Sequence, residues 1–177
     1  MDLNKFLWSH TKADILKYLT FRRQWVSMRA LEQDLTWTFP AIKKQIDSLE
    51  KNCVVVVEKT SLKRSIEIAP PIKFMLTQFL IASLQHDVQT LLYSYTTIIS
   101  KIYRWKLFDK SIDPDIVIIY HPIDEQYIMQ IKNELNIVFE SYFVMAVLAV
   151  FMSTTDFEKR QRYADKFVLE LMRIDVK

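Results

Sequence analysis

The stretch TWTFPAIKKQIDSLEKNC, residues 36–53, combines a helical pattern with side chains that could contact nucleic acid. Ile42, Ile46 and Leu49 recur at helical spacing and predict one apolar stripe. The opposite side carries small, basic and amide residues, which are the types that contact base edges or a thymine methyl in the major groove of DNA. The candidate base-reading residues are Thr38, Pro40, Ala41, Lys43, Lys44, Gln45 and Ser48.

The start of this helix is marked by two residues. Thr38 is a suitable N-cap, because its hydroxyl can accept a hydrogen bond from a free backbone amide. Pro40 falls in the first turn, where its missing N–H is not needed and its fixed φ suits a helix. On this geometry we expect Lys44 to meet guanine, Gln45 to bridge adenine and Ala41 to touch a thymine methyl.

Two helices are expected to position this segment. The first runs from about Ser9 to Phe21 with an apolar stripe of Ile15, Leu16 and Leu19, while Lys17 and Tyr18 lie elsewhere on it. The second is short, begins at the N-cap Ser27 and ends near Leu35. Two helices joined by so tight a turn form a helix-turn-helix.

A β-hairpin is predicted after the helix. The runs 54–58 and 65–69 are rich in β-branched or alternating apolar residues, and Pro70-Pro71 ends the second run. The basic residues at the tip would contact phosphate or an adjacent minor groove, and Arg29 on the second helix could clamp the backbone. The candidate tip residues are Lys59, Lys63 and Arg64.

The order of these elements resembles the winged helix-turn-helix of MarR- and ArsR-type transcriptional regulators over about residues 12–70. The family's Leu-Glu-basic-Gly-hydrophobic exit from the recognition helix is matched here by LEKNCVV, residues 49–55, with Asp47 as its acidic residue. The resemblance implies a winged-helix fold that reads DNA. Thr36 and Cys53 stand where the family often has glycine, and Asn52 is a residue that could take the left-handed conformation. The hairpin lacks the Asp–Arg pair common in the MarR branch.

Composition bounds the function. The 177 residues include no glycine, which excludes the glycine-rich nucleotide fingerprints and leaves positive-φ positions to Asn, Asp or strained residues. The single cysteine, Cys53, excludes an intramolecular disulfide and a cysteine-based zinc site. Residues 1–70 hold 12 Lys/Arg against 8 Asp/Glu, and residues 71–177 hold 12 against 13. The basic excess therefore lies in the part with the candidate helix.

Catalytic interpretations find little support. His10, His86 and His121 are far apart in sequence and show no metal-ligand spacing. Asp113 and Asp115 flank a proline, which we interpret as a solvated turn. We expect no enzyme, no metal and no cofactor. Cys53, at a helix end, is expected to be structural.

The second part of the chain is predicted to be mostly helical. A long apolar pattern from Pro71 to about Phe108 indicates a helix pair or a helix that bridges two subunits, followed by a linker at 109–115. Residues 116–120 are a strand or a buried segment, and 124–135 a helix. Residues 137–152 are too short to span a bilayer and predict a buried helix. A last helix covers 155–174, with Thr155 and Glu158 as a capping box.

Aromatic residues leave two questions open. Trp37 is interpreted as a core residue rather than one inserted toward DNA, and Phe39 remains undecided. In the second part, aromatic side chains fit either a dimer interface or an effector pocket, and we favour the dimer. These residues are Tyr93, Tyr95, Tyr103, Trp105, Tyr127, Phe139, Tyr142 and Phe143.

The prediction is a mainly α fold with a small β-hairpin. Residues 1–70 would be the winged helix-turn-helix, and residues 71–177 a helical or α+β dimerisation region. The expected function is sequence-specific binding of double-stranded DNA by a homodimeric transcriptional regulator, with the helix at 38–51 in the major groove and a basic wing at 59–64. The alternative is a protein-interaction module built on the same scaffold. We expect a cytoplasmic protein without a signal peptide or membrane segment.

Overall fold

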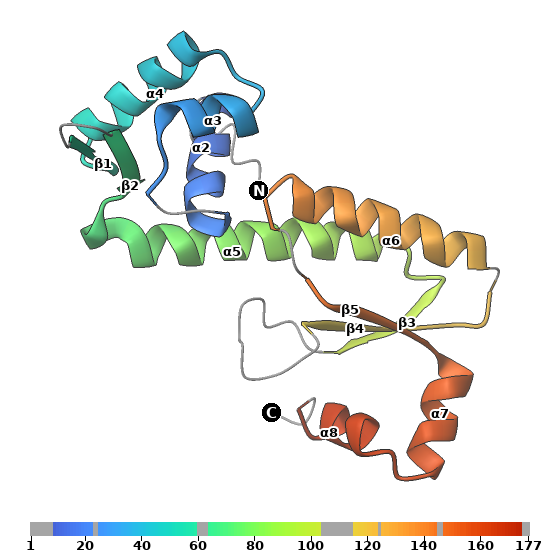
Figure 1. The fold of residues 1–177 in the computed structure, drawn as a ribbon. Coiled ribbons are helices and arrows are strands. Elements are labelled where there is room, and N and C mark those ends of the chain that lie inside the picture. Colours follow the sequence, from blue (N-terminus) through green and yellow to red (C-terminus); the bar gives the residue numbers. More distant parts are fainter. Residues whose placement is uncertain are drawn as a thin grey trace. The chain divides into compact units, whose positions relative to one another are not determined.

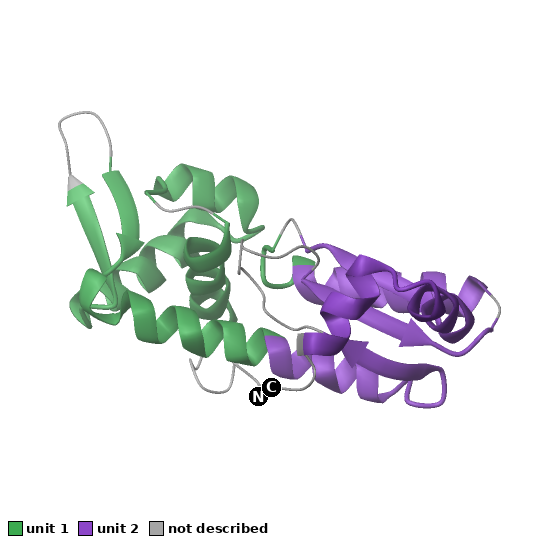
Figure 2. Ribbon diagram, turned by 90° about the horizontal axis from the view of Figure 1, so that it is seen from below, with its two compact units in different colours: residues 1–84, 140–145 green, residues 85–139, 146–177 purple. Residues whose placement is uncertain are grey.

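The computed structural model describes residues 9–22, 25–59, 64–103, 115–123, 125–144 and 147–174 (Figure 1). The chain divides into two compact units, each of which is discontinuous in sequence (Figure 2). Unit 1 comprises residues 1–84 and 140–145, and unit 2 comprises residues 85–139 and 146–177. The described residues are mainly helical, as predicted, with two small sheets.

Unit 1 begins with three helices, whose existence and limits the sequence predicted. They are α2 (His10–Phe21), α3 (Met28–Asp34) and α4 (Phe39–Lys51). Two serines start the first two helices, because each side chain accepts a hydrogen bond from a free backbone amide. Ser9 accepts from the Lys12 amide at 3.4 Å, and Ser27 accepts from the Ala30 amide at 3.2 Å.

The predicted hairpin follows α4. Strands β1 (Val55–Lys59) and β2 (Arg64–Ile68) are antiparallel, and Lys59 lies opposite Arg64 at the end toward the tip. Residues 60–63 of the tip, Lys63 included, lie outside the described residues. Val26, between α2 and α3, also pairs with Ile66, and their two N–H···O bonds measure 3.1 and 2.9 Å. This bridge fastens the hairpin to the helices.

The core of unit 1 lies between these helices and the hairpin. Lys17 and Tyr18, predicted to lie away from the apolar stripe of α2, are both buried, so that prediction was wrong. The buried face of α2 is wider than the stripe of Ile15, Leu16 and Leu19 indicates. The core cluster comprises Ile15, Leu16, Tyr18, Leu19, Val26, Met28, Leu31, Leu35, Ile42, Ile46, Leu49, Val55, Ile66 and Ile68.

Both positions where glycine was expected have a left-handed backbone. Thr36 has φ of 53° and Cys53 has φ of 57°, whereas Asn52 has φ of −92°, so the expectation for Asn52 was wrong. The reason lies in how α4 ends. The Cys53 amide donates to Glu50 and the Val54 amide donates to Leu49, each at 2.9 Å. This pattern is a Schellman motif, which requires the left-handed residue at position 53.

Replacing Thr36 and Cys53 together by glycine is expected to stabilise the protein. A left-handed residue with a Cβ costs roughly 1–2 kcal/mol. Glycine removes this cost, but it lowers stability by about 0.4–1 kcal/mol because the unfolded chain gains conformational entropy. The net gain should be about 1–2 kcal/mol for the pair, and thermal unfolding measures it. Asn52→Gly is the matched control and should destabilise, because its φ is negative and its side chain bonds the Ser48 carbonyl at 2.7 Å. A double variant no more stable than the wild type would contradict the strain argument.

Helix α5 (Pro70–Tyr93) is shorter than predicted. The apolar pattern continues beyond Tyr93, but the chain turns and then forms strand β3 (Ile99–Tyr103). The prediction of a helix to about Phe108 was therefore wrong. Residues 96–99 are all β-branched, and β-branched residues favour strands over helices.

Unit 2 contains a three-stranded sheet in the order β3-β4-β5. The central strand is β4 (Ile116–Tyr120), antiparallel to β3 and parallel to β5 (Ala149–Ser153). Residues 116–119 are buried, so the open choice between strand and buried segment is decided in favour of a central strand. Asp115 precedes β4, and its carboxylate accepts from the Leu148 amide at 3.0 Å. That bond ties the beginnings of the two parallel strands.

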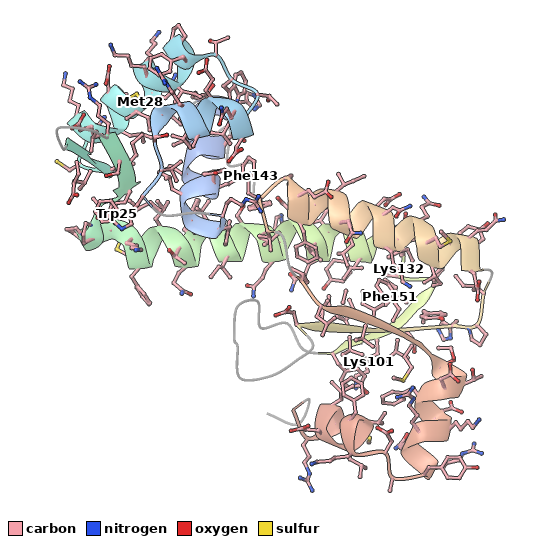
Figure 3. All side chains as sticks on the ribbon, viewed as in Figure 1. Trp25, Met28, Lys101, Lys132, Phe143 and Phe151 are labelled. Carbon is pink, nitrogen blue, oxygen red and sulfur yellow. The ribbon has the colours of Figure 1, made fainter. Side chains whose placement is uncertain are left out.

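Helices cover both sides of this sheet (Figure 1). They are α6 (Glu125–Glu140), α7 (Thr154–Arg162) and α8 (Lys166–Ile174). On the α6 side, the Lys132 ammonium lies 5.1 Å from the centre of the Phe151 ring (Figure 3). On the other side, Val168 and Leu171 of α8 pack with Val117 and other buried residues of the strands. Unit 2 is therefore an α+β unit.

Three further predictions for this region were wrong. Residues 137–152 are not one buried helix, because α6 ends at Glu140 and β5 begins at Ala149. The last helix is interrupted between Arg162 and Lys166, where Ala164 has φ of 52°. The cap of α7 is Ser153, which accepts from the Asp156 amide at 3.1 Å, and not Thr155. Most of the predicted linker at 109–115 lies outside the described residues.

A polar network joins the turn after α5 to α6 within unit 2. The Tyr95 hydroxyl donates to Glu134 at 2.7 Å, and the Gln130 amide donates to Glu134 at 2.9 Å. The bond from Gln130, followed by that from Tyr95, lowers the pKa of Glu134, and the bond to Glu134 raises the pKa of Tyr95.

None of the helices in the described part of the chain combines the length and apolar character needed to cross a bilayer.

Candidate nucleic-acid interface

The turn between α3 and α4 is held by two hydrogen bonds from distant residues. Trp37 packs against the core of unit 1, and its indole N–H donates to the Asp14 carboxylate of α2 at 2.9 Å. The Phe39 amide donates to the Glu32 carboxylate of α3 at 3.1 Å. The Thr38 side chain makes no capping bond, so its predicted role as a side-chain cap was wrong. Glu32 supplies the acceptor instead.

Helix α4 has a buried face and an exposed face. Ile42, Ile46 and Leu49 are buried in the core of unit 1, as the spacing predicted. Lys43 and Lys44 are exposed one turn into the helix. Because the apolar face is fixed in the core, the two ammonium groups are held on the outer side.

The other candidate residues of this helix divide by exposure. Thr38 and Pro40 are exposed at its start. Ala41, Gln45 and Ser48 are half-buried and recur at i, i+4 and i+7, so they form one border of the exposed face. Phe39 is 37 % exposed, which places it on the surface rather than in the core.

Charge is distributed unevenly along α4. Its first turn contains no acidic residue, and the free backbone N–H groups of a helix start carry partial positive charge. Lys43 and Lys44 add two positive charges there, whereas Asp47 and Glu50 lie exposed in the second half. The N-terminal half of α4 is therefore its more positive end, although the Glu32 carboxylate already binds the Phe39 amide there.

The remaining candidates lie on α3 and on the hairpin. Arg29 is exposed in the first turn of α3. Arg64 is exposed at the start of β2, and Lys59 lies opposite it at the end of β1. In Figure 1 the C-terminal end of α4 lies beside the hairpin of β1 and β2.

The candidate histidines and carboxylates do not come together in the described part of the chain. His10, His86 and His121 are all exposed and belong to different elements. Within the described ranges, no group of three or more His, Cys, Asp or Glu side chains is placed to hold a metal ion. Asp113, like Trp105, lies outside those ranges. Cys53 is exposed at the end of α4.

Sequence patterns missed the residues that position α4 and the hairpin. Asp14 is 23 residues from Trp37, and the residues of the Val26–Ile66 bridge are still further apart in the chain. Neither pair leaves a local signal, since a hydrogen-bond partner this distant has no fixed spacing. The exposed indole of Trp25, at φ of 59°, was also not anticipated (Figure 3).

No protein-family model, curated protein or solved structure matches the chain.

Proposed function

We propose that residues 9–69 form a winged helix that binds double-stranded DNA. In this proposal α4 enters the major groove and the hairpin of β1 and β2, called the wing, contacts the backbone beside it. The elements follow one another in the order that such a fold requires, and the hairpin is joined to the helices through Val26 and Ile66.

One observation carries the proposal. Lys43 and Lys44 are exposed on the N-terminal half of a helix whose other face is buried in the core. A helix fits the major groove, and residues near its start meet the base edges. Lysine is among the side chains that recognise guanine there. The basic positions Arg29, Lys59 and Arg64 add phosphate ligands on neighbouring elements.

A second part of the proposal is that the protein acts as a homodimeric transcriptional regulator. Helix α5 supports it, because its two charged residues, Lys73 and Asp87, are half-buried and its exposed positions are uncharged. Phe74 and Met75 are 74 % and 70 % exposed, and Tyr93 is 71 % exposed. Uncharged surfaces rich in Phe, Tyr and Met are typical of interface cores. A symmetric dimer would place two copies of α4 on half-sites about 34–36 Å apart or a multiple of that.

The experiment that tests the proposal is a binding titration with pooled random duplexes at low and moderate salt. We expect binding at low salt that weakens steeply as salt rises, and enrichment of a preferred sequence over rounds of selection. Sedimentation of the complex gives the stoichiometry, for which we expect two chains per selected duplex.

The alternative is a protein-interaction module, and one observation favours it. The exposed face of α4 carries Asp47 and Glu50 as well as its lysines, and phosphate repels carboxylates. Complete absence of binding to any duplex at low salt would favour this alternative.

Alanine at Lys63 or Arg64 is expected to weaken binding to all duplexes alike. A wing residue on phosphate carries no sequence information, and its loss should reduce the slope of log K against log salt by about 0.9. Anisotropy titrations from roughly 50 to 200 mM salt measure that slope. Lys159→Ala, an exposed lysine of α7, is the control and should leave the slope unchanged. An unchanged slope for both wing variants would show that the wing does not contact phosphate.

A further inference from the structure

A short segment of unit 1 comes from the far end of the sequence. Residues 140–145 belong to unit 1, although the chain reaches them from α6 and leaves them toward β5, two elements of unit 2. Tyr142 and Val144 are 2 % and 5 % exposed, so the segment is an integral part of the unit 1 core. We call its described residues, 140–144, the strap.

A buried lysine holds the strap on α2. Lys17 is only 9 % exposed, and its ammonium donates to the Ser141 carbonyl at 3.2 Å. The same ammonium lies 4.1 Å from the centre of the Tyr142 ring. A buried ammonium is unfavourable unless it is paired, and here a carbonyl and an aromatic face provide that pairing.

Further contacts fix the two aromatic residues of the strap. The hydroxyl of Tyr142 shares a buried 2.9 Å hydrogen bond with Ser83 of α5, and its ring meets Phe21 edge-on at 6.1 Å. Phe143, in a left-handed conformation with φ of 59°, meets Tyr18 edge-on at 5.5 Å (Figure 3). The strap is therefore held by side chains of α2 and α5 at several points.

The same helix, α2, supports the candidate reading helix. The Tyr18 hydroxyl donates to the carboxylate of Asp34, at the end of α3. Asp14 holds Trp37, in the turn that leads into α4. One turn of α2 thus connects, through named contacts, the strap and the turn before α4.

We infer that the strap is a device by which unit 2 controls DNA binding, with Lys17 as a positioning residue. This inference rests on the proposed function. Because both ends of the strap continue into unit 2, a change in unit 2 that pulls on residues 140–144 weakens their contacts with Lys17 and Tyr18. Loosening α2 frees Asp14 and Asp34, and the turn before α4 loses its fixed position. A docked strap therefore supports DNA binding, and a released strap weakens it.

The test compares variants of the full chain. Lys17→Met keeps the length of the side chain but removes the ammonium, and Tyr142→Phe removes the hydroxyl that bonds Ser83. Each should lower affinity for the selected duplex about tenfold, within the usual range of coupling between sites. Lys12→Met is the matched control, because it removes one charge from the same helix about 140° away from Lys17. It should change affinity no more than about twofold, because it removes only a long-range charge interaction that salt screens.

A second readout separates positioning from a merely structural role. Coupling is reciprocal, so duplex binding must stabilise the docked strap if the docked strap favours binding. Hydrogen exchange of the amides at 141–144 should slow when the wild-type protein is saturated with duplex, and this effect should be lost in Lys17→Met. Because duplex binding also slows every amide that exchanges through global unfolding, the slowing at 141–144 must exceed that of the other core amides of unit 1 to support positioning.

Each outcome is decisive. If the wild type binds a duplex, yet Lys17→Met and Tyr142→Phe bind equally well and exchange at 141–144 is unchanged, the strap is rejected and the proposed function stands. If the wild type binds no duplex, the proposed function fails, and thermal unfolding then tests whether the strap couples the two units. One cooperative transition in the wild type that becomes two in Lys17→Met supports coupling through the strap. The same number of transitions in both proteins overturns it.

Discussion

Replacing Lys44 and Gln45 together by alanine is expected to weaken binding to the selected duplex about 100-fold. Each well-formed contact with a base edge contributes roughly 1–3 kcal/mol of discrimination, and each 1.4 kcal/mol corresponds to about a tenfold change in affinity. Binding to random duplexes should fall only about threefold, since there the variant loses one positive charge and no base contact. Competition titrations of both duplexes at one salt concentration measure the two losses.

The matched control for this variant is Lys51→Ala at the other end of α4. Lys51 is exposed, and its replacement by alanine removes the same charge. It lies in the last turn, away from the end that would meet the bases. Its effect should be small and equal on both duplexes. Equal losses for selected and random duplexes in Lys44→Ala/Gln45→Ala would show that these residues do not read bases, whatever the affinity.

The part of the fold that sequence patterns predicted well is the part fixed by local signals. Ser9 and Ser27 mark helix starts because an N-cap acts within one turn. The stripe of Ile42, Ile46 and Leu49 specifies which side of α4 is buried. The glycine-like position at 53 could be placed from the end of the helix, since a Schellman motif is also local.

The sheet of unit 2 could not be predicted in the same way. Ile98, Ile99 and Ile102 have a spacing that fits a helix face, and the β-branched run 96–99 is too weak a signal to select the strand without its pairing with residues near Tyr120. Likewise β5 is defined by its parallel pairing with β4, which is more than thirty residues earlier in the chain. Periodicity describes one segment at a time, so it cannot choose between a helix and a strand whose partner is distant.

The candidate interface shows the same division. The exposure of Lys43 and Lys44 followed from the pattern of α4 itself. The residues that hold the start of the helix did not, because Asp14 and Glu32 accept hydrogen bonds from Trp37 and Phe39, which belong to other elements. A charged residue in an otherwise apolar stretch of sequence, such as Lys17 beside Tyr18, is therefore a position where a long-range contact should be sought.

Trp37→Ala is expected to destabilise the protein by about 2–4 kcal/mol, because it removes a large, half-buried side chain that packs against the core of unit 1. It also leaves the Asp14 carboxylate without the indole donor at 2.9 Å. Trp37→Phe keeps most of the apolar contact and loses only the N–H, so about 1–2 kcal/mol is expected. Urea unfolding followed by circular dichroism measures both, since the helical signal does not depend on the indole that is removed.

The matched control is Phe39, two residues later and exposed. Phe39→Ala should change the free energy of unfolding by no more than about 0.5 kcal/mol, as surface substitutions usually do. The pair also separates the two roles considered for aromatic residues at this turn. If Trp37 inserted toward DNA instead of the core, Trp37→Phe would leave stability unchanged and weaken binding. If Trp37 positions α4 through Asp14, Trp37→Phe lowers the free energy of unfolding. The molecules that remain folded still select the same duplex.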